Sequence, residues 1–483
     1  MKKLIPVILL LAGCTVGPDY QKPDILMPNS YRALPVDKTE APLSEPVVEQ
    51  ANLSAWWTQF GDAQLQTLID RALKANPDLM TASSRVREAR EQYIVVAAAG
   101  LPKVNASGVA ARLHSNASLA SELGTGSSSG SSSGTPAASG TDIQLYSLGF
   151  DASWELDIFG GVRRNIEAAN ANTQAAEWQM RDGEVTLTAE IAADYFALRA
   201  LQARIVILKD EAQQQRDTLD LVMAKAHAGF VTQLDVNQQN ALVTTTEAQI
   251  PQLEAEARIQ EHGIAVLMGE KPEAMIDELE RPVALATVPT SLPVGLPSDL
   301  LRRRPDVRAA ERKLAAATAD VGVAVADLYP KFNLLAGISV TSDHLNNLLS
   351  SDNLGEFGLG SIMWPIFHGG EIHANIHAKE EERKQAYYAY QKTVLTAVQD
   401  VEDALTRYTT EQRRLLSFSA AAQSDQSSVE IALQQYRVGI ATYVNVLSAQ
   451  SNYLTARDQL EQSRQAFIID LVSLYKALGG GWS

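Results

Sequence analysis

The sequence predicts a mainly α-helical protein with a membrane β part, in which a helix–strand–strand–long helix–helix unit is duplicated in tandem. Three observations predict this fold. Residues 147–156 alternate strictly between apolar and polar, which is the pattern of a strand with one apolar and one polar face. Residues 162–228 contain no proline and a single glycine, Gly183, so they predict one helix about 100 Å long. The same order of elements recurs later in the chain.

Matching motifs carry the evidence for the duplication. Asn76-Pro77-Asp78 matches Arg304-Pro305-Asp306 at an offset of 228 residues. Met268-Gly269 matches Leu478-Gly479 at an offset of 210. The offset falls because the first copy carries extra residues between its two strands. A repeat of this length indicates two copies of one structural unit.

The chain begins with the pattern of a bacterial lipoprotein signal. Lys2-Lys3 precede an apolar run, which leads to Leu11-Ala12-Gly13-Cys14. We therefore expect cleavage before Cys14 and a covalent lipid on it, with no other cofactor. Cys14 is the only cysteine, and a lone free thiol would be a liability in the periplasm. The alternative, a short buried helix with a chance cysteine, leaves this thiol unexplained.

Composition excludes some partners. The formal net charge is −16, and removal of Lys2 and Lys3 with the signal makes the mature chain −18. So acidic a protein lacks the basic footprint that nucleic acid requires, so we expect no nucleic-acid partner. No apolar run after the signal approaches the length of a transmembrane helix.

The motifs divide the chain into four segments. Residues 1–13 are the signal peptide, and residues 14–60 are a polar, proline-rich stretch that predicts a lipid-anchored extended strap. Residues 61–270 form the first repeat. Residues 271–483 form the linker and the second repeat.

Local signals place the elements of the first repeat. We expect a short helix over residues 62–75 and a second helix that Asn76 caps and Pro77 begins. The low-complexity residues 124–140 lie between the two strands and predict an exposed loop. After the long helix, a returning helix runs to about Met268, bent at Pro251.

The second repeat follows the same plan. Alternation over residues 332–340 predicts its first strand, and residues 357–366 predict a weaker second strand. Residues 371–438 contain neither glycine nor proline, which predicts a second very long helix. Gly439 turns the chain into a last helix that ends before Gly479.

The strands predict an oligomer. Strands of about ten residues span a bilayer only within a closed barrel, because lipid tolerates no unpaired sheet edge. Four strands are too few, since the smallest such barrels have about eight. Protomers must therefore pool their strands, two giving eight and three giving twelve. The alternative, a two-sheet soluble domain, is disfavoured because each strand pair lies between helices far too long for such a domain.

Several motifs, spread from one end of the chain to the other, are jointly specific. They are Cys14-Thr15-Val16-Gly17-Pro18-Asp19-Tyr20, Trp56-Trp57, Asn76-Pro77-Asp78, Trp154 to Gly161, Arg304 to Arg308, Pro365-Ile366-Phe367 and Tyr475 to Gly481. With them the sequence resembles the TolC-type outer-membrane efflux factors, in their lipoprotein (NodT-like) branch. Thr15 after the lipidated cysteine is typical of lipoproteins that are exported to the outer membrane.

The resemblance implies an assembly and its partners. It implies a homotrimer, with a 12-stranded β-barrel in outer-membrane lipid on a long α-helical barrel that extends into the periplasm. It also implies docking to a periplasmic adaptor (membrane fusion protein) and to an inner-membrane pump, commonly of the resistance–nodulation–division class.

The resemblance also implies a gate at the periplasmic tip. Gly229 and Gly439 would turn the long helices back at this tip, which the family closes as an iris held between neighbouring chains. Asp235 and Tyr436 match two of the latch positions. A competing interpretation is local, because Thr232 three residues before Asp235 predicts a capping box at the start of the returning helix.

Three further tip positions depart from the family pattern. A basic residue often stands at the position of Ala441, and acidic residues at those of Asn445 and Ser448. None of these charges is present in this chain.

Catalytic and metal-binding functions would require particular motifs. We find no HExxH, no P-loop and no GxSxG between a strand and a helix, so the sequence does not predict an enzyme. The best metal candidates are His368, Glu371, His373 and His377, of which the last two lie four apart on one helix face. Solvated side chains at a polar helix start are the favoured interpretation.

Three functions remain as alternatives for this protein. The sequence favours a passive exit duct of a tripartite efflux system for drugs or other small molecules. The exit duct of a type I protein-secretion system is the alternative among ducts. A structural lipoprotein that spaces the outer membrane from the cell wall would need neither amphipathic strands nor a Gly/Ser-rich loop.

Overall fold

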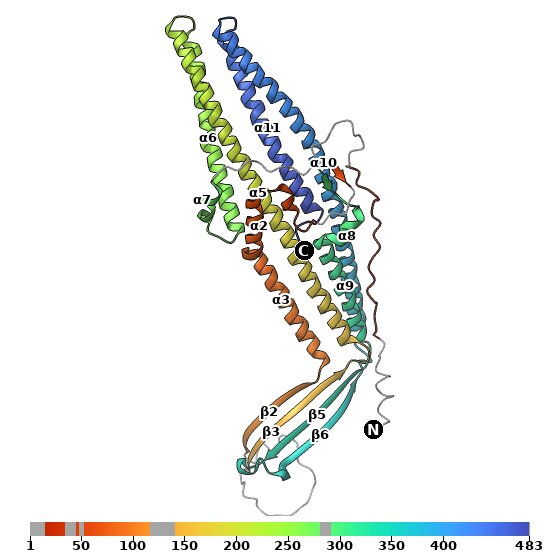
Figure 1. The fold of residues 1–483 in the computed structure, drawn as a ribbon. Helices are drawn as coiled ribbons and strands as arrows, with labels where there is room; N and C mark the ends of the chain where they lie inside the picture. Colours follow the sequence, from red (N-terminus) through yellow and green to blue (C-terminus); the bar gives the residue numbers. More distant parts are fainter. Residues whose placement is uncertain (1–14, 34–44, 48–52, 116–140, 281–290, 483) are drawn as a thin grey trace, which may run out of the picture. The chain divides into compact units, whose positions relative to one another are not determined.

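The computed structural model describes residues 15–33, 45–47, 53–115, 141–280 and 291–482 (Figure 1). The described chain is mostly helical and contains one four-stranded sheet and one small two-stranded sheet. Each repeat contributes two strands of the larger sheet, followed by a long helix and a shorter returning helix. The predicted fold class is therefore confirmed.

The elements follow the order expected for a tandem duplication. The first repeat contains α2 (Ala63–Ala75), α3 (Pro77–Ala97), β2 (Lys103–Ser115), β3 (Thr141–Leu156), α5 (Gly161–His227) and α6 (Gln233–Leu267). The second contains α8 (Leu300–Arg303), α9 (Pro305–Ala326), β5 (Lys331–Ser342), β6 (Leu354–Met363), α10 (Glu371–Arg437) and α11 (Tyr443–Ala477). Shorter elements are β1 (Glu45–Val47), η1 (Trp56–Phe60), η2 (Ala98–Gly100), η3 (Pro272–Met275), α7 (Ile276–Leu279), β4 (Ser291–Pro293), η4 (Pro297–Asp299), η5 (Leu345–Asn347) and η6 (Ser351–Asn353).

The helices of the two repeats have matched lengths. α5 and α10 have 67 residues each, and α6 and α11 have 35 each. A glycine with a left-handed backbone lies two residues after each long helix, Gly229 at φ +77° and Gly439 at φ +80°. Only glycine adopts this conformation without a steric cost, which explains why a glycine follows each long helix. The predicted ends, 228 and 438, are correct to one residue.

The four-stranded sheet has the order β2-β3-β5-β6, and all its neighbours are antiparallel. Its register places the apolar residues of β3 opposite those of β5, with Phe150 opposite Ile338 and Trp154 opposite Leu334. Directly paired residues lie on the same face of a sheet. The alternation read from the sequence therefore gives β3 and β5 a shared apolar face. On β6 the apolar Phe357 and Leu359 lie on the opposite face, paired with Gly337 and Leu335.

Two strand boundaries differ from the prediction. β6 covers Leu354–Met363 rather than residues 357–366. Its last residue pairs with Lys331, the first residue of β5, and Pro365 has no N–H with which to extend the ladder. β3 begins at Thr141 rather than at residue 147, because its ladder with β2 continues to Ser115.

The described residues fall into two compact units, and each contains segments of both repeats. One unit holds the four-stranded sheet, residues 15–21 and the adjoining turns of α3, α5, α9 and α10. Its packing relies on small side chains, with Tyr20 against Ala171, Ala315 and Ala316. No helix of the described chain is long and apolar enough to cross a membrane.

The second unit holds the remaining helices and an aromatic core. Trp56 of η1 is fully buried and stacks on Tyr475 of α11, with ring centroids 5.0 Å apart. Tyr408 of α10 stacks on Phe467 of α11 at the same separation. Stacked rings of this size provide much of the apolar burial in a core.

The proline-rich segment after residue 14 is only partly described. Its residues 45–47 form β1, which pairs in parallel with β4 of the linker, and neither strand was predicted. Lys22 forms an ion pair with Glu311 of α9 at 3.5 Å. Glu402 of α10 accepts hydrogen bonds from the backbone N–H groups of Arg32 and Ala33, at 2.7 and 2.9 Å. The segment is thus fixed to the helices at defined points.

Candidate functional site

Within each repeat, the two motifs that revealed the duplication lie at a contact between the second helix and the returning helix. The side-chain amide of Asn76 donates to the carbonyl oxygen of Leu267, the last residue of α6, over 2.8 Å. Arg304 donates in the same way to the carbonyl of Ala477, the last residue of α11, over 3.2 Å. Each repeat therefore joins the start of its second helix to the end of its returning helix.

A glycine allows this joint to close in each repeat. Gly269 and Gly479 follow the two returning helices with φ of +72° and +75°. A Cβ atom on Gly269 would lie 2.6 Å from the carbonyl oxygen of Ala75, and one on Gly479 would lie 3.1 Å from Cα of Arg304. The Met-Gly and Leu-Gly motifs thus supply close approach as well as a left-handed turn.

The second joint is strongly charged. Arg304 binds both carboxylate oxygens of Asp306, at 3.0 and 2.8 Å, and one oxygen of Asp400 on α10 at 2.9 Å. Burial alone would lower the pKa of Arg304, but the hydrogen bond and charge of Asp306, with those of Asp400, raise it. The guanidinium therefore stays charged and holds α9, α10 and α11 together.

The sheet presents the chemistry expected of a bilayer-spanning element. The apolar side chains on the Phe150 face are exposed to a degree that a soluble protein avoids, among them Leu148, Phe150, Leu334 and Ile338. On the opposite face Asn105 donates to Asp151 over 2.9 Å and Ser147 lies 3.2 Å from Thr341. The same face carries Phe357 and Leu359 of β6, so it is polar at these positions and apolar over β6. Within the described residues β2 pairs only with β3 and β6 only with β5, so both edges are open.

Two tryptophans mark the level at which the sheet meets the helices. The indole N–H of Trp154 donates to the carbonyl of Gly100, and that of Trp364 donates to the carbonyl of Leu328, both over 3.1 Å. The two indoles occupy matching places in the two repeats, and Trp154 and Trp364 are 38% and 59% exposed. Tryptophan with an apolar body and a satisfied N–H is typical of a membrane–water interface. The alternation of apolar and polar residues along the strands does not by itself predict this role.

The residues that follow Cys14 lie at this same level of the sheet unit. The N–H of Val16 donates to the carbonyl of Phe159, over 3.1 Å. Arg164 binds the carbonyl of Val16 at 3.1 Å and the carboxylate of Asp19 at 2.6 Å. Cys14 itself lies outside the described residues, so its lipidation stays a prediction.

The turn after α5 contains the predicted capping box. Asp235 accepts hydrogen bonds from the backbone N–H and the hydroxyl of Thr232, at 2.8 and 2.9 Å. Gly229 is exposed at this turn. The contacts of Asp235 within its own chain are therefore those of a cap. Its predicted latch to a neighbouring chain stays a prediction.

The turn after α10 is packed differently. Tyr436 is 2% exposed and forms a core with Val222, Tyr443 and Val446. Lys225 lies 4.1 Å from the centre of the Tyr436 ring and donates to the Tyr436 carbonyl oxygen. Burial, helped by the charge of Asp235, raises the pKa of the Tyr436 hydroxyl.

The remaining tip positions of the gate prediction are on the surface. Gly439, Asn445 and Ser448 are exposed, and the N–H of Asn445 donates to the carbonyl of Thr442 over 3.2 Å. Asn445 therefore occupies the place in α11 that Asp235 occupies in α6. In the described part of the chain the side chains of Asn445 and Ser448 form no hydrogen bond or ion pair, so the role of all three residues in a gate stays a prediction.

Comparisons with known proteins give consistent results. The family model described as "Outer membrane efflux protein" matches residues 68–270 and 296–480. Nodulation protein T of Rhizobium leguminosarum bv. viciae is 30% identical over 98% of this chain and 92% of its own. The pyoverdine export outer membrane protein OpmQ of Pseudomonas aeruginosa is 32% identical over 99% of this chain and 96% of its own.

The chain belongs to the outer membrane efflux protein family. Two solved structures agree with this. The outer-membrane channel OprN has a TM-score of 0.86 at 33% identity and covers 97% of this chain and 100% of its own. The channel CusC has a TM-score of 0.82 at 27% identity with the same coverage. The outer membrane is therefore the location of this family member, with its helices extending into the periplasm.

The predicted metal candidates are exposed in this family member. His368, His373 and His377 point to the surface, and Nδ1 of His377 lies 3.4 Å from Glu380. Among the residues that the structure describes, no three His, Cys, Asp or Glu side chains come together as a metal site.

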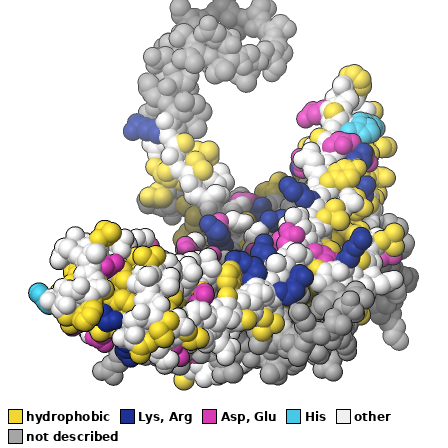
Figure 2. Space-filling view, turned by 90° about the horizontal axis from the view of Figure 1, so that it is seen from above, with side chains coloured by type: hydrophobic (Ala, Val, Ile, Leu, Met, Phe, Trp, Pro, Cys, Tyr) yellow, Lys and Arg dark blue, Asp and Glu magenta, His cyan; other side chains and the backbone are white. Residues whose placement is uncertain are grey.

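On the face that Figure 2 displays, Lys and Arg side chains are interspersed with Asp and Glu rather than gathered into one patch.

Proposed function

We propose that this protein is the outer-membrane exit duct of a tripartite efflux system, which conducts small molecules passively out of the cell. One observation carries the proposal: a single chain joins a four-stranded sheet with two open edges to two helices of 67 residues. The sheet needs further strands to exist in lipid, and the helices are about 100 Å long, enough to line a conduit through the periplasm.

A homotrimer supplies the missing strands. Three copies of the sheet give the 12 strands of a closed barrel, in which β6 of one chain pairs with β2 of the next. The duct performs no chemistry of its own in this proposal, so it requires no cofactor beyond the lipid on Cys14. The work of transport is done by a partner in the inner membrane.

The tip supports docking to a periplasmic adaptor. Phe230 and Ile440 follow the two turn glycines and are 80% and 78% exposed. Bulky apolar side chains at such exposure are typical of a surface that a partner covers. A membrane fusion protein would cover them and connect the duct to an inner-membrane pump, for which the resistance–nodulation–division class is our proposal.

The architecture of the duct does not by itself determine which substrate it conducts. The relatives are named for different cargoes: pyoverdine for OpmQ, cations for CusC of Escherichia coli, and toluene for TtgI of Pseudomonas putida. A wide aqueous lumen selects weakly, so we propose that the pump determines the cargo. Drugs and other small molecules are the expected class.

Deletion and complementation test the function. Cells that lack the gene should accumulate a fluorescent dye or become sensitive to antibiotics, and the wild-type gene should restore export. Phe230→Asp and Ile440→Asp should fail to restore it while still forming a trimer on a non-denaturing gel. Thr245→Asp, at an exposed site on α6, serves as the control. A deletion strain that secretes a protein poorly but exports every small molecule normally would favour the secretion duct instead.

A further inference from the structure

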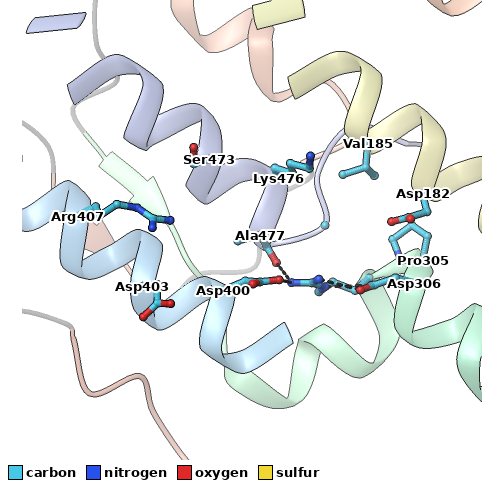
Figure 3. A pocket seen from close by; sticks show the side chains of 12 residues that line it. Asp182, Val185, Pro305, Asp306, Asp400, Asp403, Arg407, Ser473, Lys476 and Ala477 are labelled. Carbon is cyan, nitrogen blue, oxygen red and sulfur yellow. Dashed lines mark hydrogen bonds and ion pairs between the residues drawn. The ribbon is translucent and has the colours of Figure 1, made fainter. Parts of the chain in front are cut away.

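A cavity of about 320 Å³ lies beside the charged joint of the second repeat (Figure 3). Asp182 reaches it from α5, Arg407 from α10, and Ser473 and Lys476 from α11. Volumes of this size are at the lower end of the range for small-molecule sites. At about 30 Å³ per water, the cavity would hold roughly ten waters.

The floor of the cavity has its charges satisfied. Arg304 uses its guanidinium on Asp306, Asp400 and the carbonyl of Ala477. These groups are fixed by one another and by three helices. They form a rigid base and leave the recognition of a ligand to the walls.

The walls carry two opposite charges without partners. Asp182 is partly buried, and Lys476 lies across the cavity from it. In the part of the chain that the structure describes, neither side chain has an ion pair or a hydrogen bond. Burial raises the pKa of Asp182, as does the charge of Asp306, whereas Arg304 and Lys476 act in the opposite direction. Lys476 is thus near enough to act on the charge of Asp182, although the two side chains form no ion pair.

We propose that this cavity binds a small zwitterion of the α-amino-acid or dipeptide class, with its ammonium group at Asp182 and its carboxylate at Lys476. A ligand of one charge would satisfy one wall and be repelled by the other. A zwitterion satisfies both, and Ser473, on the same helix as Lys476, is a further donor to a carboxylate. Arg407 also lines the cavity, but its guanidinium already forms an ion pair with Asp470 at 3.8 Å. The proposal does not depend on which cargo the duct conducts.

The charges of this cavity are not a by-product of the duplication. At the matching offset of 210 residues, the first repeat has Val266 in place of Lys476, and Lys392 stands where the second repeat would repeat Asp182. Asn76 replaces Arg304 in the first joint. The arrangement of an acid opposite an amine thus belongs to the second joint alone.

Calorimetry on the full-length protein in detergent tests the proposal with L-alanyl-L-alanine as the probe. We expect saturable binding of the dipeptide, with putrescine and succinate, which carry charges of one sign, binding at least about tenfold more weakly. Asp182→Asn and Lys476→Gln should each raise the Kd for the dipeptide at least about tenfold. Lys209→Gln, at an exposed ion pair outside the cavity, should leave the Kd unchanged.

Three outcomes would overturn the proposal. The first is absence of dipeptide binding to the wild-type protein. The second is binding of putrescine at least as tight as that of the dipeptide, which would indicate an acidic surface only. The third is an unchanged Kd in both cavity variants. Each variant is first melted without ligand, and Lys476→Gln keeps the test valid if Asp182→Asn does not fold, because Lys476 is exposed.

Discussion

Arg304 donates a hydrogen bond to the carbonyl oxygen of Ala477, although the two residues are 173 positions apart. The same guanidinium binds Asp306 and Asp400, so three helices depend on one side chain. In the first repeat Asn76 makes only the corresponding bond, to Leu267, and caps its own helix. The two joints are equivalent in place and unequal in charge.

This inequality predicts unequal costs of mutation. Arg304→Ala should destabilise the protein by about 1.5–3 kcal/mol, because it removes charged hydrogen bonds to two partly exposed carboxylates. Asn76→Ala should cost about 1–2 kcal/mol, the value of a lost helix cap. Arg304→Lys should fall between them, since lysine lacks the planar fork that binds Asp306 through two bonds. Thermal melting in detergent, followed by circular dichroism, gives the order, and equal melting of both alanine variants would contradict it.

We expect Glu402 to hold the N-terminal segment against α10. Because its carboxylate accepts from the backbone of Arg32 and Ala33, Glu402→Ala should release this segment at a cost of about 1.5–3 kcal/mol. Trypsin should then cleave after Arg32 faster than in the wild type, with Glu402→Gln between the two. Glu430→Ala, at an exposed site on the same helix, is the matched control. Unchanged cleavage in Glu402→Ala would show that other contacts hold the segment.

Glu211 predicts a dependence of stability on pH. It is 2% exposed on α5, and its Oε2 has no partner among the described residues. Burial raises its pKa in the folded protein, against the weaker opposing effects of Arg457 and Gln215. The folded state therefore binds this proton more tightly than the unfolded chain, and the contribution of the proton to stability is lost as the pH rises through the folded pKa.

The test compares Glu211→Gln with the wild type. The variant should melt at a higher temperature, and the difference should grow from about pH 5 to about pH 8, up to about 1–3 kcal/mol for an unpartnered buried polar group. Glu430→Gln should show no such trend. A constant difference across this range would mean that Glu211 is not the titrating group.

Substitution of Asp235 should distinguish an effect on protein stability from an effect on single-channel conductance. Asp235→Ala removes both bonds to Thr232 and should cost about 0.5–2 kcal/mol at the turn. If Asp235 also latches neighbouring chains, single-channel conductance in planar bilayers should rise in Asp235→Ala. Asn445→Ala, at the matching place of the second turn, is the comparison. Earlier melting with wild-type conductance would identify Asp235 as a cap alone.

The sequence by itself determined the duplication, the two long helices, the turn glycines and the alternating strands. These features were predictable because each depends on neighbours within a few residues: the spacing of apolar side chains, the absence of proline, or a glycine at a left-handed turn. The capping box at Thr232 and the cap at Asn76 were predictable for the same reason.

Tertiary structure alone decided which of these features contact one another. Three contacts illustrate this: Arg304 bonds to Ala477, Glu402 holds Arg32, and the Trp154 indole bonds to Gly100. Each depends on which elements pack against each other in the folded chain. The end of β6 was set in the same way, by the length of its partner β5. The burial of the Tyr436 ring was also decided by tertiary packing, against Val222 and Tyr443, and its predicted role in a latch between chains stays a prediction. Contacts of this kind join residues far apart in sequence, and no local pattern encodes them.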